Sequence, residues 1–264
     1  MRLSLLTTLP IALIACSGNA PADGQAGETP PTAKPFGETI VADFVSPWAI
    51  AFLPDDRIVV TEKAGQMILL SADGKRRQTI ATITVDTEGQ GGLMDVVPAP
   101  DFAASKRLYF SYSAAGEGGK GVVLARGRLR ANGGGGERLG EIEALFSARP
   151  FVEGNGHYSG RIAFSPDGKY LFFTNGERQK FTPAQDPKMT LGKVLRLTLD
   201  GKPAPGNTLA AKGFAPEIWS YGHRNLLGIA FDKQGNLWEQ EMGPKGGDEV
   251  NLIKPGLNYG WPNA

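Results

Sequence analysis

The residues best suited to chemistry gather near the C-terminal end of this sequence. Residues 222–225 read Gly-His-Arg-Asn, residues 241–249 read Glu-Met-Gly-Pro-Lys-Gly-Gly-Asp-Glu, and residues 258–261 read Asn-Tyr-Gly-Trp. Glycine and proline favour irregular backbone, whose carbonyl oxygens are not committed to a neighbouring strand. Such carbonyls, together with carboxylates, suit Ca²⁺, and an Arg-Asn pair suits an anionic, oxygen-rich ligand. We therefore predict that this stretch binds a metal ion and a small polar molecule. Loops that only connect strands are the alternative.

The sequence contains two histidines, His157 and His223. His157 lies in a glycine-rich loop just before an expected strand, where a side chain can reach the centre of the fold. Because the pKa of histidine is ordinarily near neutral, such a residue suits a general base. On the residues alone, a structural surface histidine is the alternative for His157. His223 is expected to pack or to hydrogen-bond locally, and the four tryptophans are expected in the core.

Several motifs, in this order, resemble the soluble aldose dehydrogenases that depend on pyrroloquinoline quinone (PQQ), the glucose/sorbosone dehydrogenase family. These motifs occupy residues 47–52 (Pro-Trp-Ala-Ile-Ala-Phe), 90–96 (Gln-Gly-Gly-Leu-Met-Asp-Val), 157–161 (His-Tyr-Ser-Gly-Arg) and the three C-terminal segments above. The resemblance runs from about residue 37 to the C-terminus. It implies a six-bladed β-propeller that oxidises the C1 hydroxyl of aldose sugars to lactones and passes electrons to a respiratory acceptor.

The resemblance also implies roles for individual residues. His157 would remove the proton from the anomeric hydroxyl while hydride leaves the same carbon. Glu177, where the family more often has Asp, would orient that base. Contacts with PQQ are implied for Arg224 and Asn225, and Arg224 would also stabilise negative charge on the quinone oxygens. Gln90 matches a glutamine on the substrate side of the cofactor site, and a plain turn residue is the alternative for it. Ca²⁺ ligands are implied in two sites, one at the backbone carbonyls of Gly243 and Pro244 and one at Glu249 and Tyr259.

Hairpin signals elsewhere in the chain predict the elements that must position these residues. An apolar strand, a turn of Pro, Asp or Gly, and a second apolar strand recur at residues 49–60, 94–110, 162–173 and 229–238. Together with 36 glycines and 19 prolines, this recurrence favours an all-β propeller over a sandwich. About four to five blades fit residues 37–264. Because the resembled family closes a ring of six, we expect this sequence to be a C-terminally truncated piece of a longer protein.

The first 36 residues resemble a bacterial export signal and linker. Residues 1–16 combine a positive start, a short apolar stretch and a small-residue cleavage site that ends at Cys16, the only cysteine. This pattern predicts a lipoprotein signal peptide, with Cys16 lipidated; an ordinary cleaved signal is the alternative. Residues 17–36 predict a flexible tether. We expect a protein on the periplasmic side of the membrane, held by its lipid anchor alone to the outer membrane.

Composition limits the remaining function classes. The chain has 264 residues and a net charge of +1. Nucleic-acid binding would require a clustered basic face, so we do not expect a nucleic-acid partner. Two alternatives to a dehydrogenase remain open. One is a non-catalytic, calcium-binding propeller that acts as a binding module, and the other is a Ca²⁺-dependent lactonase, against which the Arg-Asn and Gly-Pro motifs argue. Fold alone does not decide among them, because propellers host many functions.

Overall fold

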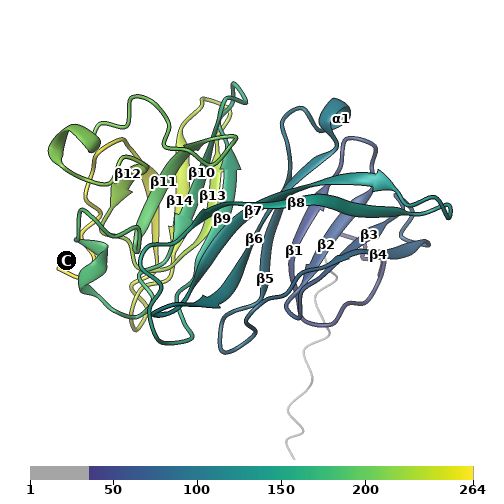
Figure 1. The fold of residues 1–264 in the computed structure, drawn as a ribbon, viewed down its shortest axis with the longest axis horizontal. Coiled ribbons are helices and arrows are strands. Elements are labelled where there is room, and N and C mark those ends of the chain that lie inside the picture. Colours follow the sequence, from purple (N-terminus) through teal and green to yellow (C-terminus); the bar gives the residue numbers. More distant parts are fainter. Residues whose placement is uncertain (1–35, 264) are drawn as a thin grey trace, which may run out of the picture. The chain divides into compact units, whose positions relative to one another are not determined.

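The computed structural model describes residues 36–263 (Figure 1). The chain divides into two units, Met1–Thr39 and Ile40–Ala264. Residues 36–39, the described part of the first unit, are exposed. The predicted signal peptide, the lipidation site at Cys16 and almost all of the tether lie outside the described residues. No helix in the described part is long and apolar enough to span a bilayer.

The second unit consists of four antiparallel sheets that follow one another along the chain. The first has the order β1-β2-β3-β4, the second β5-β6-β7-β8, the third β12-β11-β10-β9 and the fourth β13-β14-β15. Each sheet is an up-and-down meander, the unit from which propeller blades are built. Among the described residues, helix is limited to one short α-helix and two 3-10 turns. The bounds of all elements are β1 (Pro47–Phe52), β2 (Ile58–Glu62), β3 (Gln66–Leu70), β4 (Arg77–Thr82), β5 (Leu93–Pro98), α1 (Phe102–Ser105), β6 (Arg107–Gly116), β7 (Gly119–Ala131), β8 (Glu137–Ser147), β9 (Ser159–Phe164), β10 (Tyr170–Asn175), η1 (Thr182–Ala184), β11 (Lys193–Thr198), η2 (Ala210–Lys212), β12 (Ile218–Tyr221), β13 (Leu226–Phe231), β14 (Leu237–Glu241) and β15 (Glu249–Ile253).

The four hairpins expected from the sequence are the first two strands of each blade, so the predicted all-β propeller is confirmed. The turns of these hairpins contain the Asp and Gly residues expected from the sequence. Between β13 and β14 the backbone N–H of Asp232 donates to the carbonyl of Asn236 (2.9 Å). Gly235 supplies the left-handed backbone there, with a φ of 81°. Between β1 and β2, Asp56 takes a positive φ of 65°, a conformation that Asp tolerates better than most residues.

Packing between neighbouring blades forms the core. Apolar side chains of the first and second sheets make one cluster, those of the second and third another, and those of the third and fourth a third. Because an inner blade is covered on both faces, strands such as β10 and β11 are almost continuously buried and do not alternate. Strand β5 lies beside β1 and β9, and β9 lies beside β13. These first strands place the loops of successive blades next to one another.

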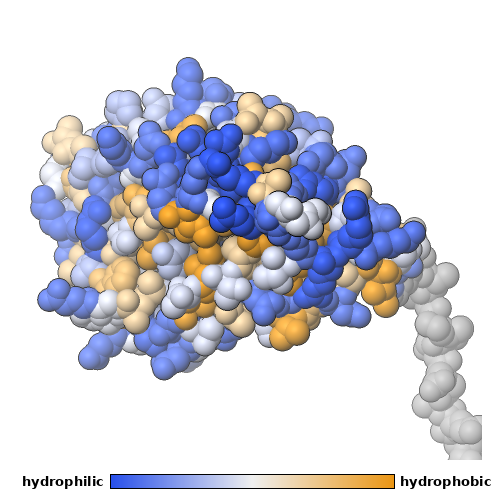
Figure 2. All heavy atoms as spheres, turned by 45° about the vertical axis from the view of Figure 1, so that its right-hand side comes forward, coloured by the Kyte–Doolittle hydropathy of each residue, from blue (hydrophilic) through white to orange (hydrophobic). Residues whose placement is uncertain are grey.

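Apolar side chains also remain exposed in the described part of the chain. They include Val45 and Phe52 in the first sheet's region and Val250 in β15, all more than half exposed. Figure 2 shows apolar patches among charged side chains on the side of the second unit that carries the first sheet. Single exposed apolar residues are normal on protein surfaces, and we draw no conclusion from them.

A buried lysine ties the third sheet to the loop before it. Lys193, the first residue of β11, is fully buried, and its Nζ donates to the carbonyls of Pro183 (2.7 Å), Ala184 (3.1 Å) and Leu191 (2.8 Å). Burial lowers the pKa of Lys193 from 10.5 to about 7. The folded state therefore gives up this proton more readily than the unfolded state does. This contribution makes stability rise between about pH 7 and about pH 10.5, and it is constant below that window.

We expect Lys193→Met to remove this pH dependence, because methionine does not titrate, and to leave three buried carbonyls without their donor. Urea denaturation at about pH 6 and about pH 9 measures both effects. The wild type should gain stability between these two values relative to the variant. An equal pH dependence in the two proteins would show that Lys193 does not titrate in this range.

Candidate active site

The predicted base and its orienting carboxylate lie in direct contact. His157 is in the loop before β9, and Glu177 follows β10 by two residues. The ring Nδ1 of His157 is 2.5 Å from Oε1 of Glu177, and both side chains are at least 95% buried. The backbone N–H of His157 donates to Oε1 of Gln90 (2.7 Å). The glutamate is therefore long enough to hold the imidazole, and Gln90 lies next to the same loop.

The surroundings of Glu177 favour its ionised form. Burial by itself raises the pKa of this carboxyl, but hydrogen bonds from His157, from the backbone N–H of Phe181 (2.5 Å) and from that of Gln179 (3.0 Å) outweigh burial. The pKa of Glu177 consequently lies below its ordinary value. An ionised carboxylate at Nδ1 fixes the ring orientation and stabilises the imidazolium that forms when the ring accepts a proton.

The lowered pKa of Glu177 predicts a pH-dependent stability. The carboxylate contributes stability above its ordinary pKa, and this contribution is lost as the pH falls through the folded-state pKa. Glu177→Gln should therefore reduce the loss of stability between about pH 6 and about pH 3, measured by urea denaturation. Glu143→Gln, at a carboxylate that is 55% exposed, serves as the control. A variant at position 177 with the wild-type pH dependence would contradict the prediction.

Backbone strain concentrates in the two loops that carry this pair. Ten non-glycine residues among those described have a positive φ, and five of the ten lie in these loops or at the first residue of β9. They are His157 (50°), Ser159 (60°), Arg178 (62°), Gln179 (59°) and Phe181 (62°). Left-handed backbone is costly for residues with a Cβ and tends to persist where the surrounding structure enforces it, often at functional sites. The strain therefore agrees with a functional role for the loops.

A buried guanidinium that the sequence did not reveal holds the His157 loop in place. Arg178 is fully buried, and it donates to the carbonyls of Gly154 (2.5 Å) and Gly156. Its guanidinium carbon lies 3.5 Å from the centroid of the Tyr158 ring, a close cation–π contact. An arginine after a strand gives no sequence signal for this role, because the role depends on a loop more than twenty residues away.

Hydrogen bonds connect this pair to the predicted cofactor contacts. The backbone N–H of Glu177 donates to the carbonyl of Arg224 (2.9 Å). The backbone N–H of Arg224 donates to Oε2 of Glu241 (2.5 Å), and its Nη1 donates to the carbonyls of Met242 (2.7 Å) and Gly243 (3.3 Å). A continuous path of contacts thus leads from the imidazole to the Gly-Pro bend after β14.

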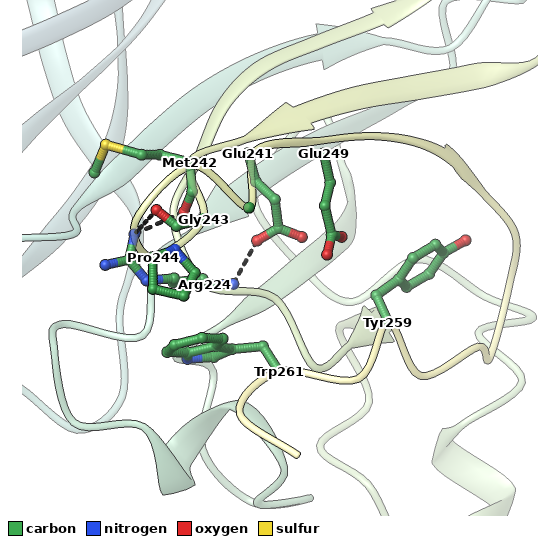
Figure 3. A pocket seen from close by; sticks show the side chains of 9 residues that line it. Arg224, Glu241, Met242, Gly243, Pro244, Glu249, Tyr259 and Trp261 are labelled. Atoms are coloured by element: carbon green, nitrogen blue, oxygen red, sulfur yellow. Dashed lines mark hydrogen bonds between the residues drawn. The ribbon is translucent and has the colours of Figure 1, made fainter. Parts of the chain in front are cut away.

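A cavity of about 170 Å³ gathers the predicted metal ligands (Figure 3). Figure 3 shows the carboxylates of Glu241 and Glu249 on the same side of it, with Tyr259 beside them. Oε2 of Glu249 accepts from Asn251 (2.9 Å), and the buried Nε of Arg224 has no hydrogen-bond partner among the described residues. The lining consists of Arg224, Glu241, Met242, Gly243, Pro244, Gly247, Glu249, Tyr259 and Trp261.

A second cavity, of about 290 Å³, contains the other two predicted contacts, Gln90 and Asn225. Oδ1 of Asn225 accepts from the hydroxyl of Ser159 (3.2 Å), which fixes the amide. Met242 lines both cavities, so they are neighbours. His157 lines neither cavity, but the residue after it, Tyr158, lines the second.

Further residues near the site test the positions expected from the sequence, and one of them had no predicted role. Trp261 lines the first cavity and Trp238 is 39% exposed, so the core placement predicted for these two is wrong. Trp48 and Trp219 are partly buried and pack against the core clusters, and Trp48 also lines the second cavity. His223 is buried and hydrogen-bonded locally, as expected. Asp248 caps a turn by accepting from the backbone N–H of Gly243 (2.9 Å). Glu241, which orients the backbone of the predicted cofactor-binding arginine, was not anticipated.

Comparison with known sequences identifies the family. The sequence model of the family described as Glucose / Sorbosone dehydrogenase matches residues 44–264. The chain is 40% identical over 224 residues to a protein named aldose sugar dehydrogenase YliI of Escherichia coli strain K12, covering 83% of this chain and 59% of that protein. It is 31% identical over 257 residues to quinoprotein glucose dehydrogenase B of Acinetobacter calcoaceticus, covering 86% of this chain and 52% of that protein.

Solved structures of aldose sugar dehydrogenases superpose on this chain. The PQQ-bound aldose sugar dehydrogenase of Streptomyces coelicolor superposes with a TM-score of 0.77 at 34% identity, over 86% of this chain and 65% of that one. The apo soluble aldose sugar dehydrogenase of Escherichia coli superposes with a TM-score of 0.77 at 38% identity, over 83% and 63%. The chain thus spans between about half and two thirds of these relatives' lengths. The resemblance drawn from the motifs is confirmed: this chain belongs to the glucose/sorbosone dehydrogenase family.

Proposed function

We propose that this chain is the part of a PQQ- and Ca²⁺-dependent dehydrogenase that carries the base and one side of the cofactor site, and that the enzyme oxidises the C1 hydroxyl of aldoses to lactones. The observation that supports this most strongly is the continuous contact path from His157 through Glu177 to Arg224 and Gly243. The names of the relatives, which include aldose sugar and quinoprotein glucose dehydrogenases, point the same way.

In this proposal His157 accepts the proton of the C1 hydroxyl at Nε2, because Nδ1 faces Glu177. The ionised Glu177 carboxylate stabilises the resulting imidazolium. Gln90 holds the backbone of the base through its side-chain oxygen. It also lines the second cavity together with Asn225, so we assign the sugar hydroxyls to that side.

The residues of the first cavity suit the cofactor and its ion. Two carbonyls in an irregular bend and the Glu249 carboxylate are the all-oxygen ligands that Ca²⁺ prefers. The unpartnered Nε of Arg224 offers a donor to an anionic oxygen. Gly243 and Pro244 would hold the cofactor's ion, and Glu249 with Tyr259 a second ion. When bound, PQQ supplies a two-electron acceptor for the hydride from C1, and Ca²⁺ polarises the quinone carbonyl.

Dye-linked oxidation of aldoses tests the proposal. Purified full-length protein should reduce an artificial electron acceptor in the presence of an aldose only after both PQQ and Ca²⁺ are added, and a chelator should abolish the activity. Lactone formation identifies C1 as the oxidised carbon. Activity that needs neither addition, or no activity with both, would remove the proposal and leave the calcium-binding module as the alternative.

Membrane anchoring and the electron acceptor are the last parts of this proposal. We propose that Cys16 carries a lipid that holds the protein on the periplasmic side of the outer membrane, and that electrons pass to a respiratory acceptor. Cys16→Ser should release the protein from washed membranes, as measured by fractionation. A variant that stays with the membrane would contradict lipid anchoring.

A further inference from the structure

Behind the first cavity, three metal-ligating side chains meet in the protein interior. Glu239 and Glu241 lie two residues apart on β14, and His223 lies in the turn between β12 and β13. All three side chains are at most 4% exposed. One ligand atom from each lies within 4.8 Å of the others. Nδ1 of His223 is 3.1 Å from Oε1 of Glu241 and 3.8 Å from Oε1 of Glu239.

Each of the three side chains is oriented by a hydrogen bond from outside the cluster. The hydroxyl of Ser220 lies 2.9 Å from Nε2 of His223. The side-chain amide of Asn251 donates to Oε1 of Glu239 (2.9 Å). The second oxygen of Glu241, Oε2, accepts from the backbone N–H of Arg224. Outer hydrogen bonds of this kind, one for each ligand, are typical of metal sites, where they fix the imidazole tautomer and the carboxylate orientation.

These outer hydrogen bonds leave polar atoms of His223 and Glu239 available to a metal ion. When His223 donates its Nε2 proton to Ser220, the lone pair on Nδ1 faces two carboxylates. The buried Oε2 of Glu239 has no hydrogen-bond partner among the described residues. Within that same part of the chain, the only ion pairs of Glu239 and Glu241 are with His223. Two buried carboxylates without a lysine or arginine partner are costly, and a cation among them would remove that cost.

We propose that His223, Glu239 and Glu241 bind one divalent transition-metal ion, of which Zn²⁺ is the best match. Two ligands about 2.0–2.1 Å from a tetrahedral ion lie roughly 3.3 Å apart, and Nδ1 of His223 lies 3.1 Å and 3.8 Å from the two carboxylates. One imidazole nitrogen with two carboxylates suits Zn²⁺ or Mn²⁺, whereas Ca²⁺ prefers oxygen ligands alone. This site is separate from the Ca²⁺ ligands proposed above, and it does not depend on the proposed dehydrogenase activity.

The ion would act as a cross-link within the fourth blade. It would join the turn before β13 to β14, and Glu241 would transmit this restraint to the backbone of Arg224. The metal-free alternative is a proton on Nδ1 that is donated to Glu241. In that case the orphaned oxygen of Glu239 is satisfied by a proton and no metal binds.

Zinc binding by the full-length protein decides between these states. Chelator-treated protein, kept in excess Ca²⁺ to fill sites made of oxygen ligands, is titrated with Zn²⁺ in a calorimeter, and bound zinc is counted by mass spectrometry after dialysis. We expect one tightly bound Zn²⁺ per chain. Glu239→Gln should weaken this binding at least about 100-fold, because loss of an outer partner alone typically costs about 10- to 100-fold.

Two controls keep the result interpretable. Glu143→Gln, at a carboxylate on β8 that is 55% exposed, should leave the tight Zn²⁺ unchanged, because Glu143 is not part of the cluster. If Glu239→Gln unfolds the protein, the visible absorption of Co²⁺-loaded wild type still reports whether a tetrahedral site with nitrogen and oxygen ligands exists, and His223→Gln should abolish that spectrum. No tight Zn²⁺ in the wild type, or tight Zn²⁺ that survives both Glu239→Gln and His223→Gln, would overturn the proposal.

Discussion

Replacing His157 with asparagine should lower kcat for aldose oxidation by about 10²- to 10⁴-fold, the range that a positioned general base contributes. Asparagine is chosen because His157 has a φ of 50°, and asparagine tolerates left-handed backbone better than alanine does. The substituted side chain can still contact Glu177 but cannot accept a proton at neutral pH. Steady-state dye reduction with saturating sugar, PQQ and Ca²⁺ measures the effect.

Cofactor binding gives the control for this variant. A fluorescence titration should show the wild-type affinity for PQQ, because no cofactor contact is assigned to the imidazole. A change in kcat of less than about threefold would fall far below the contribution of a base, and it would exclude His157 as that base. A combined loss of kcat and of PQQ affinity would instead place His157 among the residues that hold the cofactor.

Arg224→Gln should weaken PQQ binding by about 2 to 5 kcal/mol, or roughly 30- to 5000-fold in Kd. Among the described residues, the guanidinium is the only cationic side chain that lines the first cavity, and its loss also leaves the carbonyls of Met242 and Gly243 without their donor. Titration of the apo-protein with PQQ in saturating Ca²⁺ measures the change directly, independently of turnover.

A surface arginine supplies the comparison. Arg130 pairs with Glu141, and both side chains are about half exposed, so Arg130→Gln should leave the affinity for PQQ unchanged. Arg224→Lys should recover part of the lost affinity, because the charge returns without the planar fork of donors. Equal Kd values for the wild type and Arg224→Gln would exclude Arg224 from the cofactor site.

Local sequence signals predicted the inner part of each blade. The turn between β13 and β14 could be foreseen because Asp232 and Gly235 act within a few residues of one another. The predicted base was also found from its neighbours, since His157 follows glycines and precedes a strand. The structure brings it against Glu177, the partner that the motif implied.

Tertiary contacts between residues far apart in the sequence were not predicted. Arg178 holds a loop that lies 22 to 24 residues earlier in the chain, and Glu241 binds a backbone N–H 17 residues earlier. Neither residue stands in a pattern that differs from an ordinary charged residue after or at the end of a strand. Trp48 was assigned to the core because large aromatic residues are usually buried. It packs against the core, but it also lines the second cavity and carries the guanidinium of Arg161 over its ring at 4.1 Å, and these two contacts were not predicted.

The bond from the peptide nitrogen of Glu177 to the carbonyl of Arg224 joins the third sheet to the fourth. Because backbone atoms make this bond, substitutions on these two residues, other than proline at position 177, leave its donor and acceptor in place. Engineers who build chimaeras with a relative should therefore exchange residues from the His157 loop to β15 as one block. A crossover between these two sheets would combine the proposed base from one parent with the proposed cofactor site from the other, at a junction whose spacing neither parent was selected to keep.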